Sequence, residues 1–473
     1  MSLIVATGQA LLIAFLVVNV TYQATLLVTT WAGILRHRWT VWGEQNERLL
    51  ASEWTPSITI IAPAYNESVT IAASLRSILT LSYPSLEVVV VNDGSTDATL
   101  ETLQREFDLA RVHLSQSGHL QTQPVRGQYH SRRHRGLVVL DKENGGKADA
   151  LNAGLNTATG ELVCVVDADT LIEPDALLRI VRPFLADADT LAAGATIRIA
   201  NGSVVKAGRV ISARAPGRPL TGIQAVEYLR SFLVGRLGWN MLGGAFIISG
   251  AFGLFRRDAV LAVDGYYSDT VGEDIELVVR MRRRAVEEGG PYKVTFVSDP
   301  IAWTEAPSSW RVLGKQRDRW QRGLADTLMI HRKLAFNPRY KTLGLVAYPY
   351  FLVVELAGPF IEALGLATIL IAVLAASPGL VGTALLLAIL YLSGVAISIA
   401  TLVVYQWSSS DPFPARDLPR LIGFAVLEYF GYHQLTVYWR LRGMARFLKG
   451  DRDWGKMARA GFAAPAAEAP AVN

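Results

Sequence analysis

The chain has 473 residues, of which 51% are hydrophobic, and its 46 Lys and Arg against 41 Asp and Glu give a net charge of +5. This apolar content is high for a wholly soluble protein of this size. Basic runs occur at residues 132–135, 280–284 and 440–449. No nucleic-acid-binding motif accompanies them, so we expect no nucleic-acid partner and infer that they are attracted to anionic membrane lipid. The single cysteine, Cys164, excludes a disulfide framework, and its place in an apolar run predicts a packed core thiol.

The chain begins with an apolar segment. Residues 1–35 contain no charged side chain, and 9–35 are enough for one membrane span, because a bilayer-spanning helix needs ~20 apolar residues. The segment has no basic n-region and exceeds the length of a signal-peptide core, so we expect a retained anchor. Arg36 and Arg38 follow it. Since basic residues prefer the cytoplasmic side, we expect the middle of the chain to be cytoplasmic.

Residues 56–305 alternate between apolar, strand-like runs and helix-like segments. This alternation favours an α/β domain with a mostly parallel sheet and helices on both faces. The polar stretch 113–136 shows no periodicity, and we interpret it as a surface loop. We expect strands at 58–63, 86–91, 137–140, 161–166 and 190–199, and helices after residues 68, 97, 147, 173 and 272.

Carboxylates follow two of the predicted strands. Asp93 ends the second run, and Asp167 and Asp169 follow the 161–166 run. Ligands of open α/β sheets bind at the carboxyl ends of the strands. Carboxylate oxygens suit Mg²⁺ or Mn²⁺ shared with substrate phosphates, whereas no Cys and His set has the spacing of a zinc site. The pattern therefore predicts a polyphosphate ligand with a divalent cation.

Two of the strand ends admit a structural interpretation as well. Tyr65 and Glu67 follow the first strand and either reach a base or ribose or belong to a plain strand-to-helix turn, in which Asn66 or Ser68 caps the helix. Asp93 either accepts a hydrogen bond from the ligand or closes an Asx turn.

Two helix starts carry further candidates. Gly145 and Gly146 precede Lys147 at the start of a helix and fit an anion site, although the P-loop spacing is absent. Glu273 and Asp274 open another helix, where acidic residues complement the helix dipole. In the functional alternative, Asp274 is a general base that deprotonates an acceptor hydroxyl.

Residues 308–331 are predicted to form a helix whose basic and aromatic side chains suit the membrane interface. Gln316, Arg319 and Trp320 share one of its faces because they are three and four residues apart. The arginine can pair with a diphosphate, and the tryptophan can stack on a sugar ring. The polar residues on other faces, which we expect to be solvated or to face lipid headgroups, are Arg317, Asp318 and Arg322.

The C-terminal part contains a second uncharged run. Residues 363–410 are broken by Ser-Pro-Gly at 377–379, so they predict two spans joined by a tight turn. Residues 342–360 carry Glu355 and two prolines, which predicts an interfacial or bent segment. Residues 421–439 are expected to lie in the interface, unless an extra crossing is hidden in 342–360. The final residues are of low complexity and expected to be disordered.

The order of these motifs resembles the membrane-embedded family 2 glycosyltransferases, the group of cellulose, hyaluronan and poly-N-acetylglucosamine synthases. The resemblance rests on Asp93, the Asp-x-Asp pair, the Glu-Asp pair and the Gln-x-x-Arg-Trp pentapeptide, and it covers about residues 55–335. It implies a GT-A-type nucleotide-sugar domain. We expect the chain to depart from the family in having one N-terminal span and no C-terminal cyclic-dinucleotide domain, and its 113–136 stretch has no counterpart that we can assign.

The resemblance also implies a role for each motif residue. The nucleotide-sugar would be bound by Tyr65, Glu67, Asp93, Lys147, Asp167 and Asp169. Asp169 would hold the Mg²⁺ or Mn²⁺. Catalysis would fall to the pair Asp274 and Glu273, with Asp274 as the base. The acceptor and diphosphate would be positioned by Gly250, Gln316, Arg319 and Trp320. Trp454, in a Trp-Gly-Lys element near the end of the chain, would lie close enough to gate the nucleotide.

The organisation implied is that of a multi-pass protein of the cell membrane. Its parts would be a transmembrane helix at 1–38, a cytoplasmic GT-A domain at 50–340, interfacial and transmembrane helices at 341–450, and a cytoplasmic tail at 451–473. Its partners would be a UDP-sugar, a glycan or lipid acceptor, membrane lipid and accessory export proteins.

The expected function is inverting, metal-dependent transfer of a sugar from a UDP-sugar to a growing β-linked polysaccharide. Transfer would be processive and coupled to export, with a poly-N-acetylglucosamine-like product favoured. A non-processive enzyme that glycosylates a membrane lipid is the first alternative, and an inactive membrane scaffold is an alternative from another class. The presence of the full acidic and basic motif set argues against the scaffold.

Overall fold

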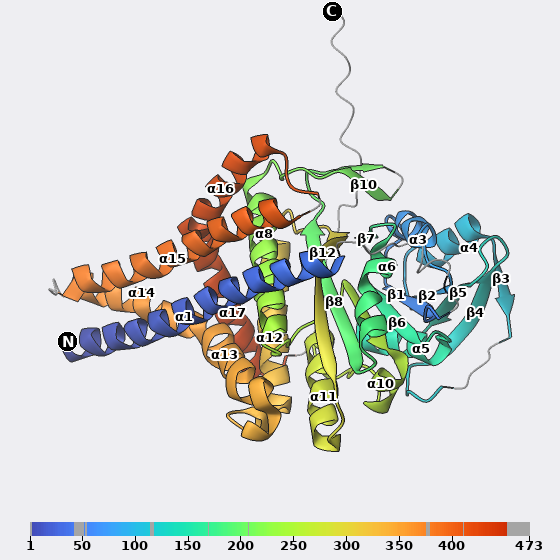
Figure 1. Ribbon diagram of the computed structural model, residues 1–473, viewed down its shortest axis with the longest axis horizontal. Helices are drawn as coiled ribbons and strands as arrows, with labels where there is room; N and C mark the ends of the chain where they lie inside the picture. Colours follow the sequence, from blue (N-terminus) through green and yellow to red (C-terminus); the bar gives the residue numbers. More distant parts are fainter. Residues whose placement is uncertain are drawn as a thin grey trace, which may run out of the picture.

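The computed structural model combines an α/β domain with a bundle of long apolar helices that extend from one side of it (Figure 1). It describes residues 2–41, 52, 54–113, 118–168, 170–206, 208–374, 379–409 and 411–451. The tail after residue 451, including Trp454 and the low-complexity end, lies outside the described residues.

Within the described residues, ten strands form one mixed sheet in the order β3-β4-β5-β2-β1-β6-β11-β8-β12-β7. Its centre, from β5 to β6, is parallel, and β8 and β12 form a second parallel pair. The strands are β1 (Ile58–Ala64), β2 (Leu86–Asp93), β3 (Leu109–Val112), β4 (Val125–Ser131), β5 (Leu137–Lys142), β6 (Leu162–Val166), β7 (Leu171–Ile172), β8 (Thr190–Ile199), β11 (Phe252–Arg256) and β12 (Lys293–Thr304). A separate hairpin joins β9 (Val204–Lys206) and β10 (Arg209–Ser212).

The continuous valine and isoleucine runs form the central strands because both faces of the sheet are covered. Ile60 of β1 pairs with Val88 of β2 on one side and with Cys164 of β6 on the other, and the side chains of Ile60 and Cys164 are fully buried. The five predicted strands and the packed core thiol are confirmed.

The interpretation of 113–136 as a loop is wrong for β4. Val125–Ser131 pairs antiparallel with both β3 and β5. Its sequence is polar because it lies towards the edge of the sheet, where only Gly127 and Gln128 are buried. An apolar alternation, which is the usual strand signal, is therefore missing.

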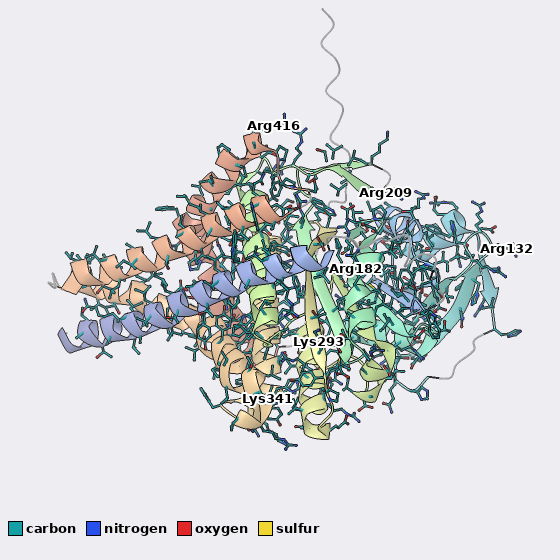
Figure 2. All side chains as sticks on the ribbon, in the orientation of Figure 1. Arg132, Arg182, Arg209, Lys293, Lys341 and Arg416 are labelled. Atoms are coloured by element: carbon teal, nitrogen blue, oxygen red, sulfur yellow. The ribbon has the colours of Figure 1, made fainter. Side chains whose placement is uncertain are left out.

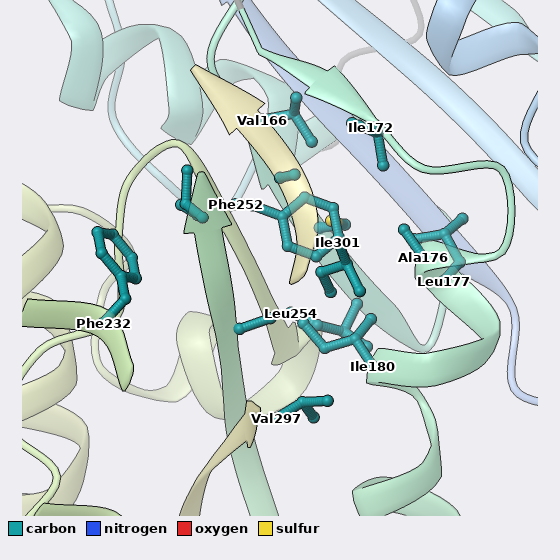
Figure 3. Close-up of a cluster of buried hydrophobic side chains, with 14 of the residues drawn as sticks. Val166, Ile172, Ala176, Leu177, Ile180, Phe232, Phe252, Leu254, Val297 and Ile301 are labelled. Carbon is teal, nitrogen blue, oxygen red and sulfur yellow. The ribbon is translucent and has the colours of Figure 1, made fainter. Parts of the chain in front are cut away.

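Helices surround the sheet, and a dense core fills the layer on the α6 side. Phe252 and Leu254 of β11 lie on the sheet face that Ala176, Leu177 and Ile180 of α6 cover (Figure 3). The helices of the domain are α3 (Ile71–Leu79), α4 (Thr99–Phe107), α5 (Lys147–Thr157), α6 (Ala176–Ile180), α7 (Arg182–Ala186), α10 (Arg257–Ala262) and α11 (Glu273–Glu288).

The remaining helices stand between the sheet and the apolar bundle or form the bundle itself. They are α1 (Ser2–Val41), α8 (Pro219–Leu229), η1 (Arg230–Leu237), α9 (Gly238–Met241), α12 (Trp310–Ile330), η2 (Arg332–Leu334), η3 (Pro338–Tyr340), η4 (Leu343–Ala347), α13 (Tyr348–Tyr350), η5 (Phe351–Leu356), α14 (Gly358–Leu374), α15 (Gly379–Ser408), η6 (Ala415–Asp417), α16 (Leu418–Leu427), η7 (Glu428–Tyr432) and α17 (His433–Leu448). The helix predicted at 308–331 is confirmed as α12.

Within the described residues, three helical stretches are long and apolar enough to cross a membrane: Val5–Arg36, Leu343–Leu374 and Gly379–Ser408. Helices α1, α14 and α15 run side by side in the bundle (Figure 1). The second stretch includes the segment expected to be interfacial or bent, which here contains two π-helical turns. The stretch after residue 417 is not among the candidate spans, and it is interrupted at Phe430 and Gly431, whose backbones are not helical.

Candidate active site

A cavity of about 1020 Å³ lies where the α/β domain meets the apolar helices. Its walls come from the strand-end loops, from the starts of α5 and α11, from α12 and from the helices of the apolar bundle. Of the residues predicted from the sequence, those that line this cavity are Lys147, Asp167, Gly250, Glu273, Asp274, Gln316, Arg319 and Trp320.

Lys147 and two carboxylates form the charged end of the cavity. Lys147 is the first residue of α5, and its Nζ lies 2.6 Å from Asp167 Oδ1 and 3.6 Å from Glu273 Oε1. Burial alone would lower the pKa of Lys147, but these two negative charges raise it above its ordinary value. Burial has the opposite effect on a carboxyl group and raises the pKa of Glu273, and the positive charge of Lys147 partly offsets this increase. Lys147 is therefore a permanent cation beside the cavity.

Backbone donors hold Asp274 at the start of α11. Its Oδ2 accepts a hydrogen bond from the Gly250 N–H at 3.0 Å, and its Oδ1 accepts one from the Ile275 N–H at 2.8 Å. A Cβ on Gly250 would lie 2.9 Å from Lys147 Nζ and 3.3 Å from Asp274 Oδ2. The absence of a side chain at Gly250 thus allows the cation, the carboxylate and this loop to meet.

Helix α12 supplies the opposite wall. Its first turn is capped by Ser309, whose hydroxyl accepts a hydrogen bond from the Val312 N–H at 3.4 Å. Gln316, Arg319 and Trp320 all line the cavity, as their shared face predicted. The ring centroid of Trp320 lies 6.5 Å from that of Tyr228 on α8, and Tyr228 stacks in turn on Phe232 of η1.

Three residues assigned to nucleotide binding are not among the described residues that line the cavity. Asp93 is buried, and its carboxylate accepts hydrogen bonds from Lys142 Nζ at 2.7 Å and from the N–H groups of Gly145 and Gly146 at 3.0 and 2.8 Å. Asp93 therefore shapes the glycine turn that leads into α5.

The other two lie at the end of β1. Tyr65 is 43% exposed, and Glu67 accepts a hydrogen bond from the Thr70 hydroxyl at 2.6 Å. The loop that carries them is fixed to the loop after β2, because Asn66 Oδ1 accepts a hydrogen bond from the Thr96 N–H at 2.8 Å. Their contacts with a nucleotide, like that of Asp93, stay predictions.

The residues on the other faces of α12 are buried, contrary to the solvated or headgroup-facing positions expected for them. Arg317 lies 2.7 Å from Glu227, and Asp318 lies 2.9 Å from Arg322. Asp318 also meets Arg442 and Arg446 of α17 at 3.0 and 3.1 Å. The expectation failed because α17 packs along this side of α12, and no local pattern in the pentapeptide reveals that contact.

The cavity also extends among the helices outside the α/β domain, with lining residues from α1, α8, η1, α14, α15, η7 and α17. The polar residues that line this extension, none of which was predicted, include Asn19, Gln23, Glu227, Tyr228, Arg230, Arg236, Glu362, Tyr391, Glu428, Tyr429 and His433. The available signal was the presence of ionisable residues within or beside apolar helical runs, where they mark functional sites by default.

Arg236 of η1 is the notable cation among them. Its guanidinium carbon lies 3.7 Å from the centroid of the Phe232 ring, and its buried Nη1 has no hydrogen-bond partner within the described part of the chain. Burial lowers the pKa of Arg236 to about 10, an effect that the charge of Asp274 opposes. This side chain therefore offers an unused donor near the carboxylate at the start of α11.

The acidic groups offer carboxylate oxygens, the donors that Mg²⁺ and Mn²⁺ prefer. Asp167 presents one such group to the cavity. Asp169, the predicted metal ligand, lies outside the described residues. Among the residues that are described, no three His, Cys, Asp or Glu side chains gather as a metal-binding group. The donor chemistry thus suits a divalent cation that is shared with substrate phosphates.

Comparison with known proteins agrees with this arrangement. A poly-beta-1,6-N-acetyl-D-glucosamine synthase of Staphylococcus aureus (strain COL) is 28% identical over 273 residues, which are 58% of this chain and 55% of that protein. The protein of the same name from Staphylococcus epidermidis (strain ATCC 35984) is 28% identical over 292 residues, covering 62% of this chain and 59% of that protein. The chain thus spans little more than half the length of these relatives.

A mannosyltransferase from Pyrobaculum calidifontis, solved in complex with GDP-Man and Mn²⁺, shares the fold with a TM-score of 0.50 and 20% sequence identity, covering 93% of this chain and 99% of that one. The family model described as "Glycosyl transferase family 2" matches residues 59–261. The model described as "Glycosyl transferase family group 2" matches residues 162–406, more than half of the chain. The protein therefore belongs to glycosyl transferase family group 2.

Proposed function

We propose that the protein transfers a sugar from a UDP-sugar to a growing β-linked polysaccharide, with inversion at the anomeric carbon. The observation that supports this most is the cavity of about 1020 Å³, which joins the charged groups at the sheet to polar and aromatic side chains of the apolar helices. Transfer of one sugar to a small acceptor would need only the part of the cavity that contains the charged groups at the sheet. A site that extends into a helix bundle suits a product that lengthens.

In the proposed reaction, Asp274 is the base. Each of its oxygens accepts one backbone hydrogen bond, which leaves a second lone pair for the acceptor hydroxyl. As the hydroxyl proton passes to the carboxylate, the acceptor oxygen forms a bond to the anomeric carbon. The bond from that carbon to the diphosphate breaks, and its electron pair leaves with UDP. One displacement inverts the configuration, so an α-linked donor gives a β-linked product.

The charge that develops on the leaving diphosphate needs fixed cations. Lys147 is held at the cavity by Asp167 and Glu273, and Arg319 lines the facing wall on α12. Such preorganised charges stabilise a transition state more than a ground state. A divalent cation held by Asp169 with the phosphates would add positive charge at the same place.

The same proposal covers the location of the protein. It is a multi-pass protein of the cell membrane with a cytoplasmic catalytic domain, because the basic residue Arg36 ends the first candidate span on the side of that domain. The polymer passes along the polar extension of the cavity, so synthesis is processive and coupled to export, with accessory export proteins beyond the membrane. The relatives named as poly-beta-1,6-N-acetyl-D-glucosamine synthases favour N-acetylglucosamine as the sugar.

A membrane lipid as acceptor is the second candidate. Phe15, Val20 and Leu390 give the same cavity apolar walls along the helix bundle. A lipid tail could lie against these side chains while its headgroup reaches Asp274. Transfer would then stop after one sugar.

Purified full-length protein, incubated with individual UDP-sugars and Mg²⁺ or Mn²⁺, tests the proposal. We expect UDP release with one donor, most readily UDP-N-acetylglucosamine, a β-linked product of many sugars, and loss of both in excess chelator. A product that carries a single sugar on a lipid would favour the second candidate. Full activity in chelator would contradict the metal requirement, and no turnover with any donor would contradict the function.

A further inference from the structure

A second pocket, remote from the charged end of the catalytic cavity, is lined by arginines. It is open, has a volume of about 560 Å³ and includes Arg214, Arg416 and Arg420. Among its described lining residues the one acid is Asp417, and the other walls are Gly202, Ala215 and Gly217. Three guanidinium groups against one carboxylate give the pocket a positive field.

No carboxylate within the described residues forms an ion pair with these arginines. Asp417 uses its Oδ2 to accept a hydrogen bond from the Ala215 N–H at 3.1 Å, and Arg214 Nε donates to the Ser212 hydroxyl at 3.4 Å. Arg416 and Arg420 are exposed, and within the described chain neither forms an ion pair with a carboxylate. Their donors are therefore available to an anion from outside.

Two helices begin at the rim of this pocket and add to its field. Helix α8 starts at Pro219, just after the lining residue Gly217, and α16 starts at Leu418, just after Asp417. The N-terminal end of a helix carries a partial positive charge. The two helices pack tightly, since a Cβ on Gly222 of α8 would lie 2.1 Å from the Phe424 ring of α16.

The third candidate span ends at Ser408, eight residues before the lining residue Arg416, so the pocket lies just beyond the end of that span. The rings of Trp31 and Trp407, near the ends of the first and third candidate spans, stack with centroids 4.7 Å apart. Tryptophans concentrate at the boundary between lipid and water. Beyond Trp407 the chain contacts the α/β domain, where Arg198 of β8 lies 3.0 Å from Asp411. It then reaches Arg416, at the edge of the molecule where α16 begins (Figure 2).

We propose that this pocket binds the phosphate of an anionic membrane lipid on the catalytic-domain side of the membrane. Arginine recognises phosphate through paired N–H donors, and the guanidinium groups converge here from two separate parts of the chain. The volume accommodates a phosphate with its glycerol unit. The bound headgroup fixes the junction of α8 and α16 at the membrane surface.

The test uses the full-length protein in neutral detergent, titrated with dioctanoyl phosphatidylglycerol and followed by native mass spectrometry. We expect saturable binding of one lipid to the wild type. The double variant Arg416→Gln/Arg420→Gln should bind at least about tenfold more weakly, since each arginine contributes to attraction of an anionic headgroup. Both positions are exposed, and an unchanged thermal transition will verify that the variant is folded.

Matched controls separate this site from general surface charge. Lys341→Gln removes an exposed cation just before the second candidate span, on the opposite side of the molecule from Arg416 (Figure 2). It should leave the affinity unchanged, and phosphatidylcholine should not compete. The proposal is overturned if the double variant binds as the wild type does, or if Lys341→Gln weakens binding equally. Displacement of the lipid by equimolar glycerol 3-phosphate or inorganic phosphate would also overturn it, because the ligand would then be a soluble phosphate.

Discussion

Asp274, the proposed base, lies close to the cation that would bind the diphosphate. Its carboxylate is fixed by the Gly250 loop and by the first turn of α11, while Lys147 lies near enough to Gly250 that no side chain fits between them. The base and the cation are thus positioned by the same glycine. This arrangement places the proposed proton acceptor and a cation that could bind a diphosphate in one cavity.

Replacing Asp274 with Asn should abolish transfer and leave UDP-sugar binding nearly intact. The amide cannot take a proton from the acceptor, and a general base contributes about 10²–10⁴-fold to a rate. Turnover and donor affinity would be measured separately. Asp269→Asn, at an exposed position in the preceding loop, is the matched control and should retain activity. If the Asp274→Asn enzyme kept more than about a tenth of wild-type turnover, Asp274 would not be the base.

At the scale of residues, the sequence predicted those cavity positions that follow a strand or share a helix face. Lys147, Asp167 and Trp320 are examples, because β-strand ends and helical spacing determine where such side chains go. Arg236 could not be assigned in this way. It reaches the cavity through the path of η1, and that path is determined by tertiary packing of the helix against α1.

Between elements, the contact of α11 with α12 determines how the two sides of the cavity face each other. Gly272, just before α11, and Gly323 in the middle of α12 approach so closely that a Cβ on Gly323 would lie 2.8 Å from the Gly272 Cα. Asp274 follows the first glycine by two residues, and Trp320 precedes the second by three. The distance between the base and the α12 motif therefore depends on this crossing.

Gly323→Ala should separate the two helices and lower turnover by about tenfold or more, because misplacement of a catalytic group by about 1 Å can cost 10²-fold. The neighbouring atoms are backbone, so they cannot move aside as a flexible side chain would. Gly290→Ala, where no heavy atom lies within 4 Å of the added Cβ, is the control and should behave as the wild type. Equal turnover of the two variants would show that the crossing does not position the site.

The contact of α12 with α17 depends on Asp318, which is fully buried among three arginines, Arg322, Arg442 and Arg446. Asp318→Asn removes the anion that these three cations share, while Arg446 keeps Asp451 at 2.8 Å. The change should destabilise the protein by about 3 kcal/mol, a typical cost of breaking a buried ion pair. Thermal unfolding in detergent would measure the change. Asp108→Asn removes an exposed carboxylate whose arginine partners lie 4.0 and 3.8 Å away, and its unfolding temperature should hardly change. Equal shifts for both variants would contradict a structural role for Asp318.

Whole helices and strands were predictable where the segment is apolar along its entire length. The valine-rich central strands and the long apolar helices are of this kind. Strand β12 was not predicted because its register shifts around Pro300 break the alternation of apolar and polar residues. Strand β11 was not predicted because it is only five residues long, includes Gly253 and begins directly after the Gly250 loop. Both strands lie in the antiparallel or irregular part of the sheet. There, pairing with neighbouring strands determines the structure more than the local pattern of apolar and polar residues does.

For the molecule as a whole, the cavity makes the α/β domain and the helix bundle parts of a single site. Trp320 of α12 lines the same cavity as Tyr391, Tyr429 and His433 of the helix bundle. A sugar added at Asp274 would enter this extension of the cavity as the next donor binds. Neither the strand motifs nor the apolar runs alone predict the extension, because its walls come from helices distant in the sequence.

The most direct test of this account is the fate of the product across a membrane. The full-length protein would be reconstituted in lipid vesicles, molecules with the α/β domain facing outward would be supplied with UDP-N-acetylglucosamine from outside, and the product would then be treated with an added glycosidase. We expect a long polymer that resists digestion until detergent opens the vesicles, and no polymer from the Asp274→Asn variant. A product that is fully digested in intact vesicles, or that never exceeds one sugar, would contradict the coupling of synthesis to passage through the helix bundle.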